Sequence, residues 1–149
     1  RPLGAVHDGY VTLDAFGAPR VAGGICVTPH DMLRFAEMVR NFGTVGIRQI
    51  VPEDWIAEFR SFDDTGPWQR QQDGPRHFPH GSYRSKWYRT GLPDGEFAAI
   101  GIHGQWIWVN PAREVTIIRM ASNDLPIDPD AGPVLHAAFD AVCRAFAPA

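Results

Sequence analysis

Residues 97–110 read FAAIGIHGQWIWVN and residues 114–120 read EVTIIRM, and these two runs decide the fold. Both are rich in Ile, Val, Trp or Thr, which fit the pleated surface of a sheet. Asn110-Pro111-Ala112-Arg113 lies between them, and an Asn-Pro step favours a chain reversal. We therefore predict an antiparallel hairpin within the stretch from Phe97 to Asn123.

Residues 101–104, Gly-Ile-His-Gly, interrupt the first run. Glycines inside a strand give up side-chain packing and backbone order, so they usually mark a bulge or a place where a ligand approaches the backbone. We expect a site built from backbone groups at this point. Gly23-Gly24 is a second candidate for close approach.

The composition is that of a globular domain. The 149 residues are 44% hydrophobic and 21% charged, which supplies enough apolar sequence for a core. The net charge is -3 and no basic tract occurs, so nucleic acid and anionic membranes are unfavourable partners and small or neutral substrates fit better. No apolar run approaches the roughly 18 residues that suggest a membrane span.

Metal-binding and disulfide patterns are weak. Cys26 and Cys143 are far apart and without CxxC spacing, which favours two buried thiols. His77 and His80 are spaced as a metal pair, but no third ligand of helical spacing lies nearby, so we expect neither a metal nor a cofactor. Because the chain starts at Arg1 without Met, we interpret it as lacking upstream sequence; the compartment stays open, with the cytoplasm slightly favoured over the periplasm.

Three segments predict helices. Thr28 as N-cap, Pro29 at the first position and Gly43 beyond the end define the clearest one. A short helix should run from Pro52 to Phe59. A last helix from about Asp130 should pack on the hairpin with a stripe of Leu135, Ala138, Phe139, Val142 and Phe146.

The remaining segments are less regular. Short strands are expected within 6–14 and 83–88. The stretch from Ser61 to Ser82 lacks periodicity, and so long a loop is usually functional or disordered, so we expect a rim over a pocket. Trp87, Trp106 and their aromatic neighbours cannot all face inward, since adjacent strand residues point to opposite faces, and some should line a pocket or an interface.

No serine lies in a sequence motif typical of a catalytic nucleophile. Ser61, Ser82, Ser85 and Ser122 are not followed by Lys three residues later, and none lies in Gly-x-Ser-x-Gly. Tyr-x-Asn and Ser-x-Asn are absent as well. His103, between the two glycines, has two readings: a core or edge histidine with satisfied hydrogen bonds, which its spacing favours, or a group that contacts a ligand.

At residues 101–105 the sequence resembles the serine-reactive β-lactamase-like hydrolases, a family that includes class C β-lactamases, D,D-peptidases, certain esterases and 6-aminohexanoate-dimer hydrolases. The resemblance covers almost the whole chain. Pro2-Leu3-Gly4 with His7-Asp8, and residues 22–35, AGGICVTPHDMLRF, resemble the segment after the family's second motif. Residues 101–106 with Asn110-Pro111 resemble the 6-aminohexanoate-dimer hydrolase branch most.

The family's three motifs are Ser-x-x-Lys, Tyr-x-Asn or Ser-x-Asn, and Lys-Thr-Gly on an inner strand. Only the third has a counterpart here, at Ala99-Ile100-Gly101. The resemblance then implies that the backbone N–H of Ile102 is an oxyanion-hole donor. An alternative register, Ile102-His103-Gly104, makes Gln105 the donor.

The resemblance implies further site residues and a substrate class. Substrate-binding candidates are Gly101, His103, Gly104, Gln105, Gly23 and Trp87. Ala99 replaces the lysine that meets the carboxylate of β-lactam drugs, which favours amides or esters without that carboxylate as small-molecule substrates.

The expected fold is α+β: an antiparallel sheet with a packed C-terminal helix, forming the C-terminal portion of a β-lactamase/D,D-peptidase-like fold. Residues 1–149 would be part of a single domain whose N-terminal part, with the nucleophilic serine, is the missing partner. The whole protein would be a serine hydrolase working through an acyl-enzyme, and the 149 residues alone should not catalyse. The alternative is a catalytically inactive binding module with this fold.

Overall fold

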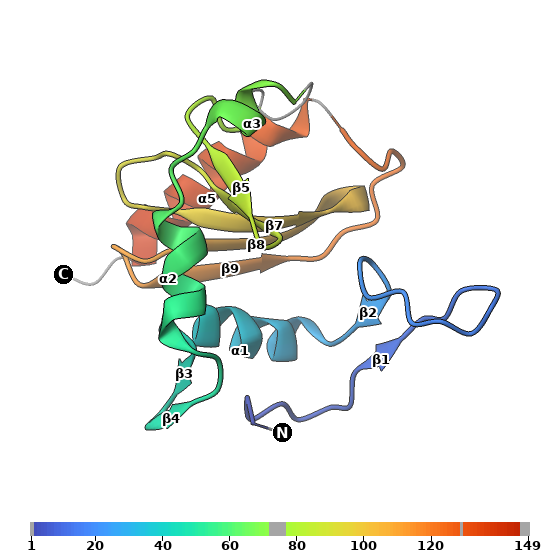
Figure 1. Cartoon of the computed structure of the whole chain (residues 1–149). Coiled ribbons are helices and arrows are strands. Elements are labelled where there is room, and N and C mark those ends of the chain that lie inside the picture. The colour runs from blue at the N-terminus through green and yellow to red at the C-terminus, as the bar shows by residue number, and fades with distance from the viewer. Residues whose placement is uncertain (1, 72–76, 129, 147–149) are drawn as a thin grey trace.

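The computed structural model describes residues 2–71, 77–128 and 130–146. Its centre is an antiparallel sheet in which five strands follow one another in chain order (Figure 1). They are β5 (Ser82–Arg84), β6 (Trp87–Arg89), β7 (Phe97–Gly101), β8 (Gln105–Asn110) and β9 (Val115–Arg119). Helices cover both faces, which confirms the predicted α+β class with a packed C-terminal helix.

The hairpin predicted around Asn110 is present as β8 and β9. The Asn110 carboxamide oxygen accepts from the Arg113 N–H at 2.9 Å, and its nitrogen donates to Glu96 Oε1 at 3.2 Å. Asn110 is buried, so this side chain ties the turn to the strand connection before β7. The reversal therefore rests on side-chain hydrogen bonds as well as on the proline.

The prediction that residues 97–110 form one strand with glycines inside it is wrong. The chain reverses at a 3-10 turn, η1 (Ile102–Gly104), and Gly101 pairs with Gln105 across a second hairpin. His103 and Gly104 both have positive φ, +58° and +83°, which a continuous strand does not allow. The two glycines thus bracket a turn.

The sheet separates two hydrophobic clusters. On one face α1 (Pro29–Arg40) and α2 (Glu53–Ser61) pack against alternate residues of the strands. On the other face α5 (Ala131–Phe146) packs over the remaining residues. The first cluster includes Phe59, Trp87, Phe97 and Val109, and the second includes Trp68, Phe78, Trp106, Trp108 and Phe139.

The predicted signals for α1 and α2 are confirmed. Thr28 Oγ1 accepts from the Asp31 N–H at 3.1 Å, and Gly43 follows the helix with φ +84°. The second helix starts at Glu53, directly after Pro52. Both ends of α1 are therefore fixed by groups that the sequence identifies.

The helix α5 is present, but its predicted buried stripe is partly wrong. Phe139 and Cys143 are buried, whereas Val142 is 38% exposed and Phe146 is 74% exposed. Apolar residues occur around the whole helix, so spacing alone does not identify the side that contacts the sheet. No helix of the described residues is long and apolar enough to cross a bilayer.

The expected strand at 83–88 is a hairpin of β5 and β6. Its reversal is made by Ser85 and Lys86, which have φ of +52° and +70°. In the expected loop 61–82, the four residues of α3 (Gly66–Gln69) form a helical turn, with Trp68 buried.

The N-terminal segment forms an arm next to α1, on the side of this helix away from the sheet (Figure 1). The expected strand at 6–14 is short: β1 (Tyr10–Val11) pairs with β2 (Ile25–Cys26), and the short hairpin β3 (Thr44–Val45) and β4 (Arg48–Gln49) follows α1. The Asp31 carboxylate accepts from the N–H groups of Val6 and His7 at 2.9 and 3.2 Å, so it anchors the arm to α1.

Candidate functional site

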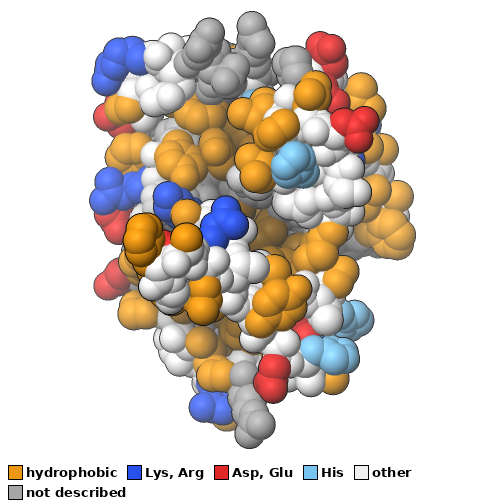
Figure 2. Space-filling model, turned by 90° about the vertical axis from the view of Figure 1, so that its right-hand side faces the viewer, with side chains coloured by type: hydrophobic (Ala, Val, Ile, Leu, Met, Phe, Trp, Pro, Cys, Tyr) orange, Lys and Arg blue, Asp and Glu red, His pale blue; other side chains and the backbone are white. Residues whose placement is uncertain are grey.

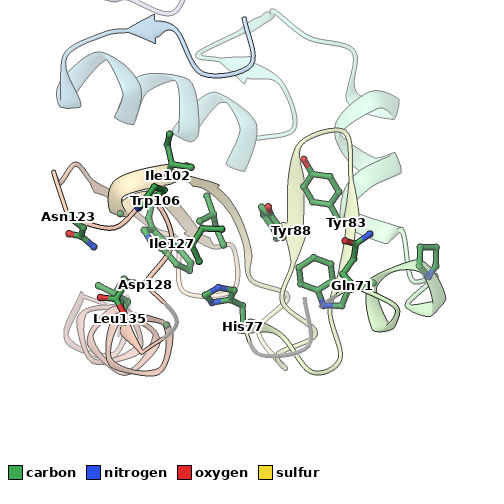
Figure 3. A pocket seen from close by; sticks show the side chains of 18 of the residues that line it. Gln71, His77, Tyr83, Tyr88, Ile102, Trp106, Asn123, Ile127, Asp128 and Leu135 are labelled. Carbon is green, nitrogen blue, oxygen red and sulfur yellow. The ribbon is translucent and has the colours of Figure 1, made fainter. Parts of the chain in front are cut away.

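A cavity of about 650 Å³ lies where β7 ends, on the side of the sheet that carries α5 (Figure 3). It is lined by residues within 64–71 together with His77, by the β5–β6 hairpin, by residues within 100–106 from the end of β7 into β8, and by residues within 123–128 and 131–135. The side chains that matter below are those of Trp68, Tyr83, Tyr88, Ile102, Trp106, Asn123 and Asp128.

The cavity borders a strand edge that pairs on one side only. β6 pairs with β7 at Phe97 and Ala98 and no further, whereas β8 pairs with β7 as far as Gly101. From Ala99 onward, the side of β7 that faces away from β8 is paired with no strand in the part of the chain that the structure describes. Ile100, Gly101 and Ile102 line the cavity at this open edge.

The direction of the backbone groups follows from the neighbouring ladder. The Thr90 N–H donates to the Glu96 carbonyl oxygen at 3.1 Å, so that carbonyl points toward β6. Successive residues of an extended strand direct their polar groups to opposite sides, which puts those of Ile100 on the side of Glu96. Gly101 is extended (φ −111°, ψ 164°), so the alternating direction of the backbone polar groups continues as far as the Ile102 N–H. That N–H therefore points away from β8, toward the open edge.

The turn that holds Ile102 is fixed by the stretch after β9. The His103 N–H donates to the Pro126 carbonyl oxygen at 2.9 Å, and the His103 carbonyl oxygen accepts from the Asn123 N–H at 3.1 Å. The imidazole Nδ1 lies 2.8 Å from the Asn123 carbonyl oxygen. Arg119 donates to the Gly104 carbonyl oxygen. These contacts join the turn to Arg119, Asn123 and Pro126.

Four of the six substrate-binding candidates, namely His103, Trp87, Gly23 and Gln105, do not line the cavity. The Nδ1 atom of His103 contacts the Asn123 carbonyl oxygen, as expected for a core or edge histidine with satisfied hydrogen bonds. Trp87 is buried in the opposite cluster, stacked on Phe59 at 5.4 Å. Gly23 lies in an exposed turn of the arm with no atom within 4 Å of the position a Cβ would take.

Gln105 also lies outside the cavity lining. Gln105 pairs with Gly101 in the sheet. The Gln105 carboxamide donates to the Ala121 carbonyl oxygen and accepts from the Ala121 N–H, the latter at 3.2 Å. In the register that makes Gln105 the donor, the donor residue is therefore already paired within the sheet, whereas Ile102 lies at the open edge. Gly101 and Gly104 do line the cavity.

Sequence reasoning anticipated the aromatic wall only in part, because it did not select Tyr83. Tyr83 and Tyr88 lie opposite Asn123 and Asp128 in Figure 3. The ring centroids of Tyr83 and Tyr88 are 4.5 Å apart. Trp68 packs edge-on against Tyr88 at 5.4 Å. Burial, and then the neighbouring Tyr83, raise the pKa of Tyr88, so its hydroxyl is neutral at pH 7. Two sequence signals pointed toward this wall: the expected rim at 61–82, and the expectation that some aromatic residues next to Trp87 and Trp106 line a pocket, as Tyr88 does.

Behind the cavity lies an aromatic layer around His136. Its ring stacks on Phe78 at 5.0 Å and packs against Trp106 at 5.7 Å. Burial, and then the nearby His77, lower the pKa of His136 to about 4, so the ring is neutral at pH 7. Its Nε2 is buried without a hydrogen-bond partner among the described residues. Of the His136, Phe78 and Trp106 side chains, only that of Trp106 lines the cavity, and the neutral His136 ring packs against it.

The cavity lining is acidic. Asp64 and Asp128 are its carboxylates, and no Lys or Arg belongs to the described lining. Both carboxylates also accept a nearby N–H, from Gly66 and Asp130 respectively, each at 3.0 Å. Among the described residues no group of three His, Cys, Asp or Glu is placed to hold a metal ion.

A sequence model of the family described as beta-lactamase matches residues 1–140. The chain belongs to the beta-lactamase family. In this family, the 6-aminohexanoate-dimer hydrolase of Paenarthrobacter ureafaciens is 28% identical to the chain over 120 residues, which are 80% of the chain and 30% of that enzyme.

Two solved structures share the fold of this beta-lactamase family member. One, "Putative 6-aminohexanoate-dimer hydrolase from Bacillus anthracis", has a TM-score of 0.78 and 21% identity, over 95% of the chain and 34% of that protein. The other, a "putative beta-lactamase from Bacteroides dorei DSM 17855", has a TM-score of 0.63 and 19% identity, over 96% of the chain and 48% of that protein. The chain therefore spans about a third of the first two relatives and about half of the third.

Proposed function

We propose that these residues form the strand side of the active-site cleft of a hydrolase that cleaves amides or esters through an acyl-enzyme. The nucleophilic serine and its base lie in a part of the domain outside the 149 residues, since no serine here has the required neighbours. Family membership and the likeness to 6-aminohexanoate-dimer hydrolase support the reaction class.

The role of Ile102 is electrostatic. When the serine oxygen bonds to the substrate carbonyl carbon, the carbonyl oxygen becomes an oxyanion, and the Ile102 N–H donates to it. The C–N or C–O bond of the leaving group then breaks, and water later releases the acyl group. One such preorganised donor contributes about 3 kcal/mol to the transition state.

One observation carries this proposal: the pairing of β6 stops at Ala98 while β7 continues to Gly101 beside the cavity. An unpaired strand edge can bind the amide of a substrate as a further strand would. The turn at His103 is held by Asn123 and Pro126, so the N–H before it is fixed in direction. Fixed donors of this kind cost little reorganisation during the reaction.

The lining favours substrates without a carboxylate near the reacting bond. Ala99 stands where the resemblance places a lysine, and the described lining has carboxylates and no Lys or Arg. An anionic substrate group would lack a cationic partner among these residues and would be repelled by Asp64 and Asp128. The aromatic wall of Tyr83 and Tyr88 suits an apolar acyl or leaving group.

The decisive variant is Ile102→Pro in the protein encoded by the complete reading frame. Ile102 is the first residue of a 3-10 turn and follows an extended residue, both of which proline tolerates, so the change removes the N–H with little change of backbone. We expect kcat for an uncharged p-nitrophenyl ester to fall about 100- to 1000-fold.

Ile102→Ala is the matched control, because it removes most of the side chain and keeps the N–H. We expect it to retain activity within about tenfold. Equal losses in both variants would contradict the donor role. A complete protein that binds the ester without turnover or covalent labelling by a fluorophosphonate would favour the inactive binding module.

A further inference from the structure

We propose that His77 determines substrate specificity in the cleft: its imidazole donates a hydrogen bond to an ether or carbonyl oxygen of the substrate other than the oxygen of the reacting carbonyl. The inference rests on the proposed function, because it assigns a further residue of the same cavity. The sequence pairs His77 with His80 by spacing alone, and the structure separates them. His77 lines the cavity, whereas His80 is exposed and is not part of the lining.

The ring of His77 lies between the two walls of the cavity. Figure 3 shows it between Tyr88 on one side and Asp128 on the other. His77 is half-buried, and the centroid of its ring lies 6.1 Å from that of Trp106 and 6.4 Å from that of His136. The imidazole therefore packs against β8 and against α5 while it lines the cavity.

A glycine in α5 makes room for this ring. A Cβ built on Gly132 would lie 2.8 Å from His77 Nδ1 and 3.2 Å from His77 Cε1, closer than ordinary contacts. Glycine is unfavourable inside a helix, and Gly132 has no positive φ that would require it. The close approach of the imidazole is thus a physical reason for glycine at this position, and it places the Nδ1–Cε1 edge of the ring against the helix.

The chemistry of the lining favours an oxygen as the partner of His77. The ionised carboxylates of Asp64 and Asp128 only accept hydrogen bonds, and the indole N–H of Trp68 already donates to the Phe78 carbonyl oxygen at 2.7 Å. An imidazole keeps at least one N–H in both of its charge states. His77 is also the only side chain of the described lining that can carry a positive charge, which suits an oxygen with partial negative charge.

An oxygen scan of ester substrates tests this inference on the protein encoded by the complete reading frame. The probes are p-nitrophenyl hexanoate, pentyl hexanoate, and the counterparts of each in which an ether oxygen replaces one methylene of the acyl or alcohol chain at successive positions. Each kcat/KM is divided by the rate of hydrolysis by hydroxide, which corrects for intrinsic reactivity. We expect at least one ether ester to be preferred over its alkyl counterpart by about 3- to 10-fold.

Variants assign that preference to the imidazole. His77→Phe keeps an aromatic ring without an N–H and should abolish the preference, whereas His77→Gln keeps a donor and should retain part of it. His80→Phe is the matched control from the same segment and should retain all of it. Gly132→Ala should displace the ring and reduce the preference, with no further reduction when it is combined with His77→Phe. A ratio of two esters does not depend on the amount of folded protein, so a general loss of structure does not imitate this result.

Three outcomes overturn the inference. A preference that survives in His77→Phe assigns the donor to another group, such as the carboxamide of Gln71 or Asn123. Turnover by the unmodified protein without any preference for an ether ester overturns the role of His77 and leaves the proposed function standing. A complete protein that turns over none of the esters contradicts the proposed function and this inference together.

Discussion

Two glycine pairs have similar sequence signals and different environments in the molecule. Gly101 and Gly104 flank a turn at an open strand edge beside the cavity, whereas Gly23 and Gly24 lie in the N-terminal arm. In the arm, the Gly24 N–H donates to the Arg20 carbonyl oxygen at 2.6 Å and closes a turn whose two glycines do not line the cavity. A glycine pair therefore indicates a constrained backbone, and only the surroundings decide whether a ligand can use it.

The reasons for glycine also differ within each pair. Gly104 has φ +83°, a conformation that other residues rarely adopt. Gly101 is extended, but a Cβ there would lie 3.1 Å from Gln105 Cβ. Gly24 is buried, and a Cβ would lie 2.7 Å from the Arg20 carbonyl oxygen, whereas Gly23 is exposed with open space around it. These four environments give a graded set of tests.

The largest expected effect is on catalysis, from Gly101→Val in the complete protein. The branched side chain would press on Gln105 and displace the turn that fixes Ile102, so we expect kcat/KM for an uncharged ester to fall at least about 100-fold. Steady-state kinetics measure this. Gly17→Asn, in an exposed turn of the arm with φ +82° and open space, is the control and should keep full activity. Unchanged kinetics in Gly101→Val would break the contrast between the two pairs.

The next effect is on stability, from Gly104→Ala. A side chain at φ +83° is strained, and its Cβ would collide with Arg119 and Asn123, which hold the turn. We expect the free energy of unfolding to fall by about 2–3 kcal/mol, measured by urea denaturation. A change below about 0.5 kcal/mol would mean that the turn relaxes freely.

Local signals predicted those elements whose ends are set by nearby residues. Thr28, Pro29 and Gly43 define α1 through side-chain and backbone contacts within a few positions. The β8–β9 reversal at Asn110 is local in the same sense. In contrast, residues 97–110 are apolar on both sides of residues 101–104, so the sequence did not distinguish one interrupted strand from two strands. The β5–β6 turn uses Ser85 and Lys86, neither a usual residue at positive φ.

The cavity lining was predicted residue by residue only where the backbone carries the signal. Gly101, Ile102 and Gly104 were selected from sequence, and all three line the cavity. Tyr83, Asn123 and their neighbours come from segments far apart in the chain, and tertiary packing alone brings them together. Trp87 was misplaced because alternation on a strand gives two faces without identifying which one meets the cavity.

The arm provides a pH test of the same comparison, since the carboxylate of Asp31 attaches it, whereas the turn at Gly104 is held by contacts to Asn123, Pro126 and Arg119. Hydrogen bonds from the backbone N–H of Val6, and then from Thr28, His7 and Arg34, hold the pKa of Asp31 well below its usual range. A lowered pKa means that the stabilisation is complete above the usual Asp value of about 4 and is lost as pH falls further, toward the folded-state pKa.

We therefore expect the Val6 and His7 amides to stay protected from pH 7 to about 4 and to lose protection below that range, after correction for the intrinsic exchange rate. In Asp31→Asn the loss should be present already at pH 7. Asp14→Asn is the control: Asp14 accepts from the Phe16 and Ala18 N–H groups at 2.8 and 2.9 Å within the arm and does not contact α1. Protection that is equal at pH 7 and pH 3 would show that other contacts hold the arm.

The smallest effects separate the two glycines of the arm from each other. Gly24→Ala places a Cβ against the Arg20 carbonyl group and Thr12, and we expect a loss of about 1–2 kcal/mol in the free energy of unfolding. Gly23→Ala meets open space at an ordinary φ and should change stability by less than about 0.5 kcal/mol. Gly23→Ala should also leave ester hydrolysis by the complete protein unchanged. A fall in kcat/KM without a fall in stability would restore Gly23 to the substrate-binding set, because it would mean that the arm reaches the cleft in the intact protein.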